Sequence, residues 1–231
     1  MNKPNFAIEA HALSKHVDGQ AILVRVDLQL ECGQCIALMG DNGAGKTTLL
    51  KCLAAIKKPS SGTVCWFGRP AATEVSERRL IALKPHEDCL YTHLTAYENL
   101  MFAARMIGLP NPANRSQDIL WKLGLSRVSD TPVRQLSKGM RQRLGFGRAV
   151  IHDPPIWLLD EPFAGLDDSS RNQILQIIRE KRRTGGAICF STHQDLDIEE
   201  LDAQVVQLHQ GTTFLSQPNA SSAFFNRKRA S

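Results

Sequence analysis

The first segment that could do chemistry is a glycine-rich loop at residues 40–48. Its members are Gly40, Asp41, Asn42, Gly43, Ala44, Gly45, Lys46, Thr47 and Thr48. Glycines at this spacing, followed by lysine and threonine, form a phosphate loop, in which backbone amides and the start of the next helix surround the phosphates of a nucleotide. Lys46 is expected to reach the β and γ phosphates, and the Thr47 hydroxyl to bind Mg²⁺. The pattern predicts a nucleotide ligand, but kinases, GTPases, helicases and transporters all share it.

Two neighbouring carboxylates, Asp160 and Glu161, form a second candidate site. They follow the apolar residues 156–159, a pattern that is typical of a buried strand. A carboxylate at the end of such a strand, beside the phosphate loop, is what a Mg²⁺ ligand requires, and we assign this role to Asp160. Glu161 points elsewhere and can deprotonate a water molecule aimed at the γ phosphate. The alternative is a strand end capped by two solvated acids.

A third pattern, Leu136-Ser137-Lys138-Gly139-Met140, lies at the start of a predicted helix. Ser137 is a favourable N-cap, and Gly139 would let a phosphate approach the first amides of the helix. By itself this segment predicts no more than a helix N-terminus.

Taken in order, these segments closely resemble the ATP-binding subunit of ATP-binding cassette (ABC) transporters. Two further segments fit the same order: Phe163-Ala164-Gly165-Leu166-Asp167 and Ser191-Thr192-His193. The resemblance reaches to about residue 215. The resemblance implies two subunits that pair head to tail around two ATP molecules. Each ATP would contact the phosphate loop of one subunit and Ser137 and Gly139 of the other. Asp167 would lie at the interface, and His193 would hydrogen-bond the γ phosphate.

Several positions depart from the commonest residues of this family. Lys138 and Met140 are substituted in the signature segment 136–140, while the phosphate-contacting pair remains. His16 stands where the family usually has an aromatic residue that stacks on adenine, a contact that an imidazole can also make. His86 stands where the family normally has a glutamine that touches Mg²⁺ and the attacking water.

His86 and the residues up to Leu100 resemble the haem-exporter ATPase of cytochrome c maturation. The alternatives are ATPases of other small two-component exporters. The role of His86 also has an alternative, because a histidine in a loop can simply face solvent. A histidine at this place could change its charge between pH 5 and 8, which a glutamine cannot do.

Other classes of cassette ATPase are less consistent with the sequence. DNA-repair members separate the phosphate loop from the signature segment by a long coiled coil, whereas about ninety residues without sustained heptads intervene here. Translation members carry two cassettes in one chain. A regulator that binds nucleotide without hydrolysis is opposed by Glu161 and His193. We therefore expect an ATPase that drives transport.

The elements that must position these residues follow an α/β pattern. Alternating apolar residues predict two antiparallel strands between residues 6 and 30, with a turn at Asp18-Gly19. Further short strands are expected at residues 35–39, 63–67, 80–83, 156–159, 187–190 and 204–208. The fold class is thus an α/β P-loop NTPase core, as the family resemblance implies, with an antiparallel β subdomain.

Between residues of about 94 and 152, helix signals replace strand signals, which predicts an inserted helical subdomain. Thr95 and Glu98 form a capping box, and the helix that they start should end near Gly108. A second helix is expected from Asn114 to Leu123, and a third after Ser137. Residues 1–215 would form the ATPase domain, and residues 216–231 a short basic tail that is solvated or binds anionic lipid.

Composition narrows the range of partners. The 231 residues are 42% hydrophobic and 22% charged, which is ordinary for a globular protein. The formal net charge of +5 is compatible with an anionic partner but selects none. No apolar run approaches the roughly 18 to 20 residues that cross a bilayer, and the first residues lack the apolar core of a secretory signal.

Together with these limits, the family resemblance implies a peripheral protein on the cytoplasmic face of the inner membrane, with no nucleic-acid partner. A separate transmembrane permease would dock near His86 to Leu94. Cys32 and Cys35 form a CxxC without the second pair that a zinc site requires. Structural, reduced thiols are expected, with redox chemistry as the alternative.

Overall fold

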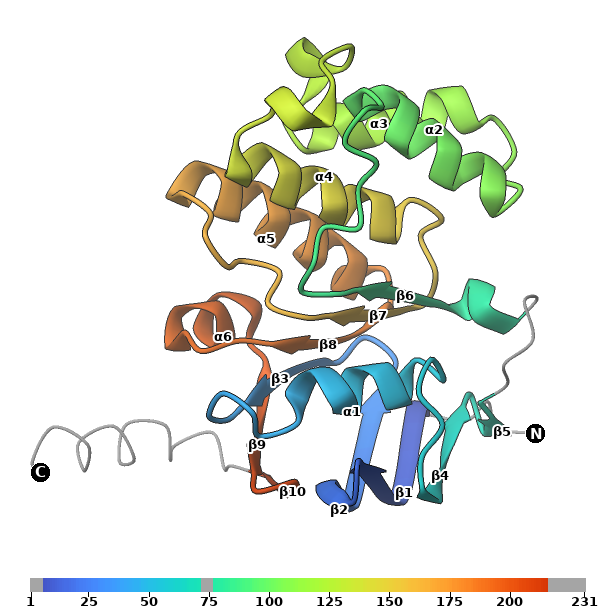
Figure 1. The fold of residues 1–231 in the computed structure, drawn as a ribbon, viewed down its shortest axis with the longest axis vertical. Helices are drawn as coiled ribbons and strands as arrows, with labels where there is room; N and C mark the ends of the chain where they lie inside the picture. The colour runs from blue at the N-terminus through green and yellow to red at the C-terminus, as the bar shows by residue number, and fades with distance from the viewer. Residues whose placement is uncertain (1–5, 72–76, 216–231) are drawn as a thin grey trace, which may run out of the picture.

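The computed structural model describes residues 6–71 and 77–215 and contains two sheets (Figure 1). The central sheet has six strands in the order β10-β9-β3-β8-β7-β6. Five of them run parallel: β3 (Cys35–Met39), β6 (Ile81–Lys84), β7 (Ile156–Leu159), β8 (Ala187–Ser191) and β9 (Gln204–His209). The last strand, β10 (Thr212–Leu215), pairs antiparallel with β9.

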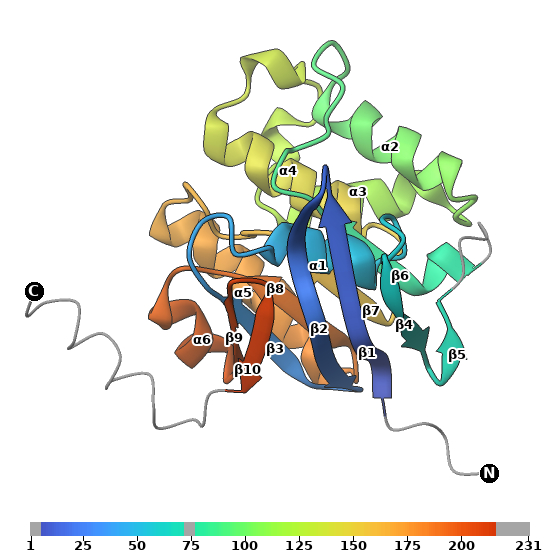
Figure 2. The same ribbon diagram turned by 60° about the horizontal axis from the view of Figure 1, so that its bottom comes forward.

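The second sheet is antiparallel and lies beside the central sheet, as Figure 2 shows from below. Its order is β2-β1-β4-β5, and its strands are β1 (Phe6–Val17), β2 (Gln20–Glu31), β4 (Ser61–Trp66) and β5 (Arg69–Pro70). The turn between β1 and β2 lies at Asp18 and Gly19, as predicted, and both residues have positive φ. Such backbone twist matches that of the two flanking strands.

The central sheet is buried on both faces because alternate residues enter different cores. Ile36 and Leu38 of β3 pack in a core with the antiparallel sheet and α1 (Lys46–Leu53). Cys35 and Ala37 pack in a second core with the helices above the other face of the sheet. Strands that are covered on both faces have few exposed positions, which explains the continuous apolar runs in the sequence.

The helices of the second core form two layers over the sheet (Figure 1). Next to the sheet lie α4 (Lys138–Val150) and α5 (Asp168–Arg183), and beyond α4 lie α2 (Ala96–Met106) and α3 (Pro112–Lys122). In the part of the chain that the structure describes, the remaining helices are α6 (Asp195–Leu201) and three single 3₁₀ turns, η1 (Glu77–Leu80), η2 (Ser126–Val128) and η3 (Val133–Gln135). Within the described ranges, no helix is both long and apolar enough to cross a bilayer.

The structure confirms the α/β fold and the helical region, and it corrects several boundaries. The capping box is present: the Glu98 amide donates to Thr95 Oγ1 at 3.1 Å, and the Thr95 amide donates to Glu98 Oε2 at 2.8 Å. The second helix begins at Pro112 instead of residue 114, because proline is well tolerated in the first turn of a helix. β4 and β6 are each shifted by one or two residues, β5 and β10 were not predicted, and the predicted tail at 216–231 lies outside the described residues.

Candidate functional site

The site lies at the carboxyl ends of the parallel strands, where the segments after β3, β6, β7 and β8 meet. The phosphate loop connects β3 to α1. Gly40 is required there because its φ is 152° and a Cβ atom would lie 2.3 Å from the Leu208 carbonyl oxygen. Gly45 caps α1 with a φ of 105°. These two residues let the backbone turn sharply into the helix, so that its first amides face the loop.

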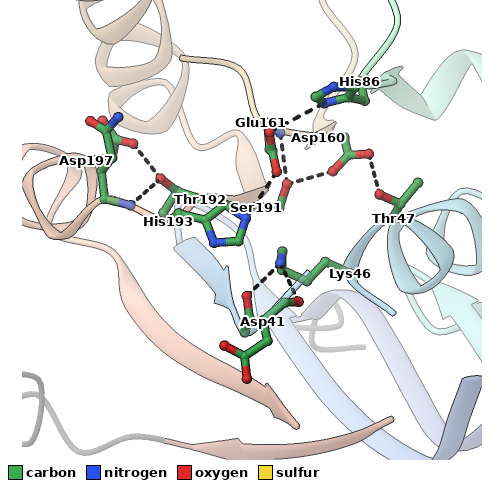
Figure 3. Close-up of polar contacts among 12 residues, drawn as sticks. Asp41, Lys46, Thr47, His86, Asp160, Glu161, Ser191, Thr192, His193 and Asp197 are labelled. Atoms are coloured by element: carbon green, nitrogen blue, oxygen red, sulfur yellow. Dashed lines mark hydrogen bonds and ion pairs between the residues drawn. The ribbon is translucent and has the colours of Figure 1, made fainter. Parts of the chain in front are cut away.

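Lys46 is folded across the phosphate loop (Figure 3). Its Nζ donates to the carbonyl oxygens of Gly40 at 2.7 Å and Asp41 at 3.1 Å. Only 7% of the residue is exposed. Burial lowers the pKa of the Lys46 ammonium from its ordinary value, and the carboxylates of Glu161, Asp160 and Asp41 act in the opposite direction. The ammonium is therefore held in the loop where phosphate oxygens could replace the two carbonyl acceptors.

Asp160 is almost fully buried and joins the phosphate loop to β8. Thr47 Oγ1 donates to Asp160 Oδ2 at 2.7 Å, and Ser191 Oγ donates to Asp160 Oδ1 at 2.7 Å. A hydroxyl and a carboxylate are oxygen ligands of the kind that Mg²⁺ prefers. No group of three or more His, Cys, Asp and Glu side chains in the described chain could hold a metal by itself. Thr47 and Asp160 thus fit a Mg²⁺ ion that takes its other ligands from phosphate and water.

Glu161 faces a different set of neighbours from Asp160. Its φ of 47° turns the chain after β7, and its amide donates to Ser191 Oγ at 2.8 Å. Glu161 Oε1 lies 3.2 Å from His193 Nε2, and Oε2 lies 3.4 Å from His86 Nδ1 (Figure 3). The two adjacent carboxylates therefore diverge, which places one beside Thr47 and the other between two histidines. This geometry is consistent with the separate roles that the sequence predicts for them.

The structure does not bring all the predicted residues together. His16 is exposed near the end of β1, where its amide donates to Ser60 Oγ at 3.0 Å. Ser137 caps α4 by accepting from the Met140 amide at 3.2 Å. A Cβ atom on Gly139 would have only Leu166 Cδ2, at 3.9 Å, as a neighbour, so the start of α4 is sterically open. Within the described residues, no hydrogen bond or ion pair connects these three residues to Lys46, Asp160 or Glu161.

Two supporting interactions were not predicted. Ser191 bridges the Asp160 carboxylate and the Glu161 amide, a role that the sequence pattern does not predict for this serine. Thr192 Oγ1 donates to Asp197 Oδ2 at 2.5 Å, and Arg171 Nη2 lies 2.8 Å from Asp197 Oδ1 in an almost fully buried ion pair. This network connects α5 and α6 to the residue before His193. In the sequence, only the Ser-Thr-His pattern indicates that this region is functional. Asp197 and Arg171 lie on other elements, so no local pattern predicts their contacts with it.

The cysteine geometry favours structural thiols over redox chemistry. Cys32 and Cys35 flank the turn between β2 and β3, with Cys32 exposed and Cys35 buried. Burial raises the pKa of the Cys35 thiol to about 12. A redox-active cysteine needs an accessible thiolate, so Cys35 is poorly suited to that role.

The sequence of the chain is similar to those of known proteins. Residues 23–164 match the family model described as ABC transporter. The chain is 37% identical over 193 residues to the cytochrome c biogenesis ATP-binding export protein CcmA 2 of Cupriavidus metallidurans, a match that covers 83% of this chain and 92% of the relative. It is 36% identical over 190 residues to the ABC transporter ATP-binding protein NatA of Bacillus subtilis, covering 80% and 77% of the two chains.

Among solved structures, the chain is similar to one described as the ATP-binding subunit of an ABC transporter. The TM-score is 0.85 at 29% sequence identity, and the match covers 97% of this chain and 95% of the other. The similarity thus includes both sheets and the helical region.

Proposed function

The chain belongs to the family of ABC transporter ATP-binding subunits, and from that premise we propose that it hydrolyses ATP to drive a separate membrane subunit that exports haem for cytochrome c biogenesis. The observation that carries the ATPase assignment is the divergence of Asp160 and Glu161. Asp160 lies against Thr47 at the phosphate loop, while Glu161 lies between His86 and His193. One carboxylate is thus available to a metal and the other to a water molecule.

In the proposed mechanism, the amides of the phosphate loop and Lys46 bind the β and γ phosphates. Mg²⁺, held by Thr47 and Asp160, would neutralise charge that develops on the phosphate oxygens. Glu161 takes a proton from the attacking water, and His193 donates a hydrogen bond to the γ phosphate. His86 orients Glu161 through its Nδ1 contact.

The complete ATP site requires a second subunit in this proposal. The resemblance to this family implies two ATP-binding subunits that pair head to tail beside a separate membrane subunit. In this chain Ser137 and Gly139 lie at the open start of α4 without a contact to Lys46. A head-to-tail copy would bring the partner's Ser137 and the partner's Gly139 to the γ phosphate, with Asp167 at the interface. His16 would contribute a stacking surface for adenine from the end of β1.

The membrane subunit is proposed to dock on the segment from His86 to Leu94 at the cytoplasmic face of the inner membrane. Tyr91 in this segment is 47% exposed and contacts Phe102 of α2 edge-on, with ring centroids 5.0 Å apart. Arg148 of α4 lies over the Tyr91 ring at 5.9 Å. Exposed aromatic side chains supported by an arginine are typical of protein interfaces.

Haem export is supported by the CcmA 2 relative and by the histidine at position 86. NatA, an ABC transporter ATP-binding protein at 36% identity, is almost as similar to this chain. The alternative is therefore an ATPase that drives the membrane subunit of another small exporter. Deletion of the gene distinguishes haem export from this alternative. Loss of mature c-type cytochromes, restored by the parent gene but not by its Glu161→Gln variant, is the expected result. Normal cytochrome c content after deletion would refute haem export and leave the ATPase assignment in place.

A further inference from the structure

A buried lysine lies next to the proposed site, at the end of the strand that pairs with β7. Lys84 is the last residue of β6 and is only 1% exposed, which makes it one of the largest fully buried side chains of the described chain. Its carbonyl oxygen accepts from the Asp160 amide at 2.8 Å, and His86 follows two residues later. Burial lowers the pKa of the Lys84 ammonium, while Asp88 and Asp160 favour its charged form. A cation in such a place is costly unless polar partners surround it.

The partners of Lys84 belong to helix α4 and to the loop that carries His86. With the Gln142 amide oriented so that donors meet acceptors, Lys84 Nζ donates to Gln142 Oε1 at 3.1 Å. In the same orientation Gln142 Nε2 donates to Asp88 Oδ1 at 2.7 Å. Gln142 is itself only 8% exposed. The three side chains, which we name the Lys84 clamp, thus connect the end of β6, α4 and the loop between β6 and α2.

The backbone supports the same connection one turn further along α4. A Cβ atom on Gly145 would lie 3.0 Å from the Asp88 carbonyl oxygen and 3.2 Å from Asp88 Cα. Residues 142 and 145 face the same side of a helix, because they are three positions apart. The loop therefore lies directly on α4 at both residues, with a side-chain contact at the first and a backbone contact at the second.

We propose that Lys84 is a positioning residue that, through Gln142 and Asp88, holds the start of α4 in a fixed place relative to the loop that presents His86 to Glu161. This inference rests on the proposed function, because Ser137 and Gly139 begin α4. The clamp makes the signature segment and the Glu161 environment move together. The phosphate loop and α1 pack in the other core, so ATP binding by a monomer does not depend on the clamp.

The test replaces the lysine by an apolar side chain of similar length. Lys84→Met should lower kcat by about tenfold, as expected for the loss of a hydrogen bond from a charged donor, with little change in KM for ATP. Amide hydrogen exchange in the isolated monomer should speed up in residues 85–90 and 138–145, but not in 46–53. Lys122→Met is the matched control, since this lysine pairs with Glu180 at the surface, and it should behave like the parent.

Two further variants keep the proposal testable if Lys84→Met does not fold. Asp88→Asn retains an oxygen acceptor for Gln142 and should remain close to the parent, whereas Asp88→Leu should reproduce the slow turnover and the local exchange. The exchange measurement does not require ATP hydrolysis. It therefore tests the Lys84 clamp even if the proposed ATPase mechanism is wrong. Parent-like kcat and exchange in Lys84→Met and Asp88→Leu would overturn the proposal. Faster exchange throughout the chain, or an equal loss of ATP affinity, would also overturn it by showing a general structural role.

Discussion

Replacing Glu161 with glutamine is expected to lower ATP turnover by about 10² to 10⁴-fold, the usual contribution of a general base, while ATP binding remains intact. Glutamine keeps the size of the side chain and can still contact His86 and His193, but it cannot accept the proton of the attacking water. Lys46, Thr47 and the rest of the phosphate loop are unchanged. Steady-state hydrolysis by the assembled transporter and equilibrium ATP binding measure the two effects separately.

The same variant should accumulate as an ATP-bound dimer, because the nucleotide that closes the interface is no longer removed. Glu199→Gln on the exposed face of α6 is the matched control and should retain parent turnover. Hydrolysis by Glu161→Gln at the parent rate would show that another group activates the water.

Replacing Ser137 with arginine should abolish ATP-driven dimerisation but leave the ATP affinity of the monomer nearly unchanged. The substitution removes the hydroxyl that caps α4, at a cost of about 1 kcal/mol, and places a bulky cation where the other subunit's nucleotide would lie. Lys46→Ala should instead weaken binding to the monomer, because this ammonium lies within the phosphate loop itself. Ligand titration of the monomer and size-exclusion chromatography with ATP distinguish the two variants.

An arginine elsewhere on the helical region provides the control for this substitution. Ser126 is exposed at the start of η2, and Ser126→Arg should dimerise like the parent. If Ser137→Arg and Lys46→Ala lost monomer affinity equally, both residues would belong to the ATP site of one chain.

The sequence predicted the parts of the site that depend on local order along the chain. A buried strand followed by glycine, lysine and threonine, or by two carboxylates, places these residues at one edge of a parallel sheet, because all such strands end there. The capping box at Thr95 could be predicted for the same reason, since both partners lie within one turn. Small errors arose where the local signal is ambiguous, as at Pro112, which can either end a loop or begin a helix.

The contacts that could not be predicted join residues far apart in the chain. His86 and Glu161 are brought together only because β6 pairs with β7, and a sequence pattern does not give that pairing. Ser191 became the bridge between Asp160 and Glu161 through the pairing of β7 with β8. The burial of Lys84 could not be predicted either, because its partner Gln142 lies far along the chain on α4. A lysine after an apolar run is more typical of an exposed strand end.

The shared ATP site is tested most directly by mixing two variants in a Glu161→Gln background, where bound ATP is not hydrolysed. One copy carries Lys46→Ala and the other carries Ser137→Arg. In a head-to-tail dimer the mixed pair contains one site with both Lys46 and the partner's Ser137 intact. We expect the mixture to form dimers that retain ATP, at one molecule per mixed pair, although neither variant does so alone. A mixture that retains no more ATP in dimers than the separate variants would contradict the shared site.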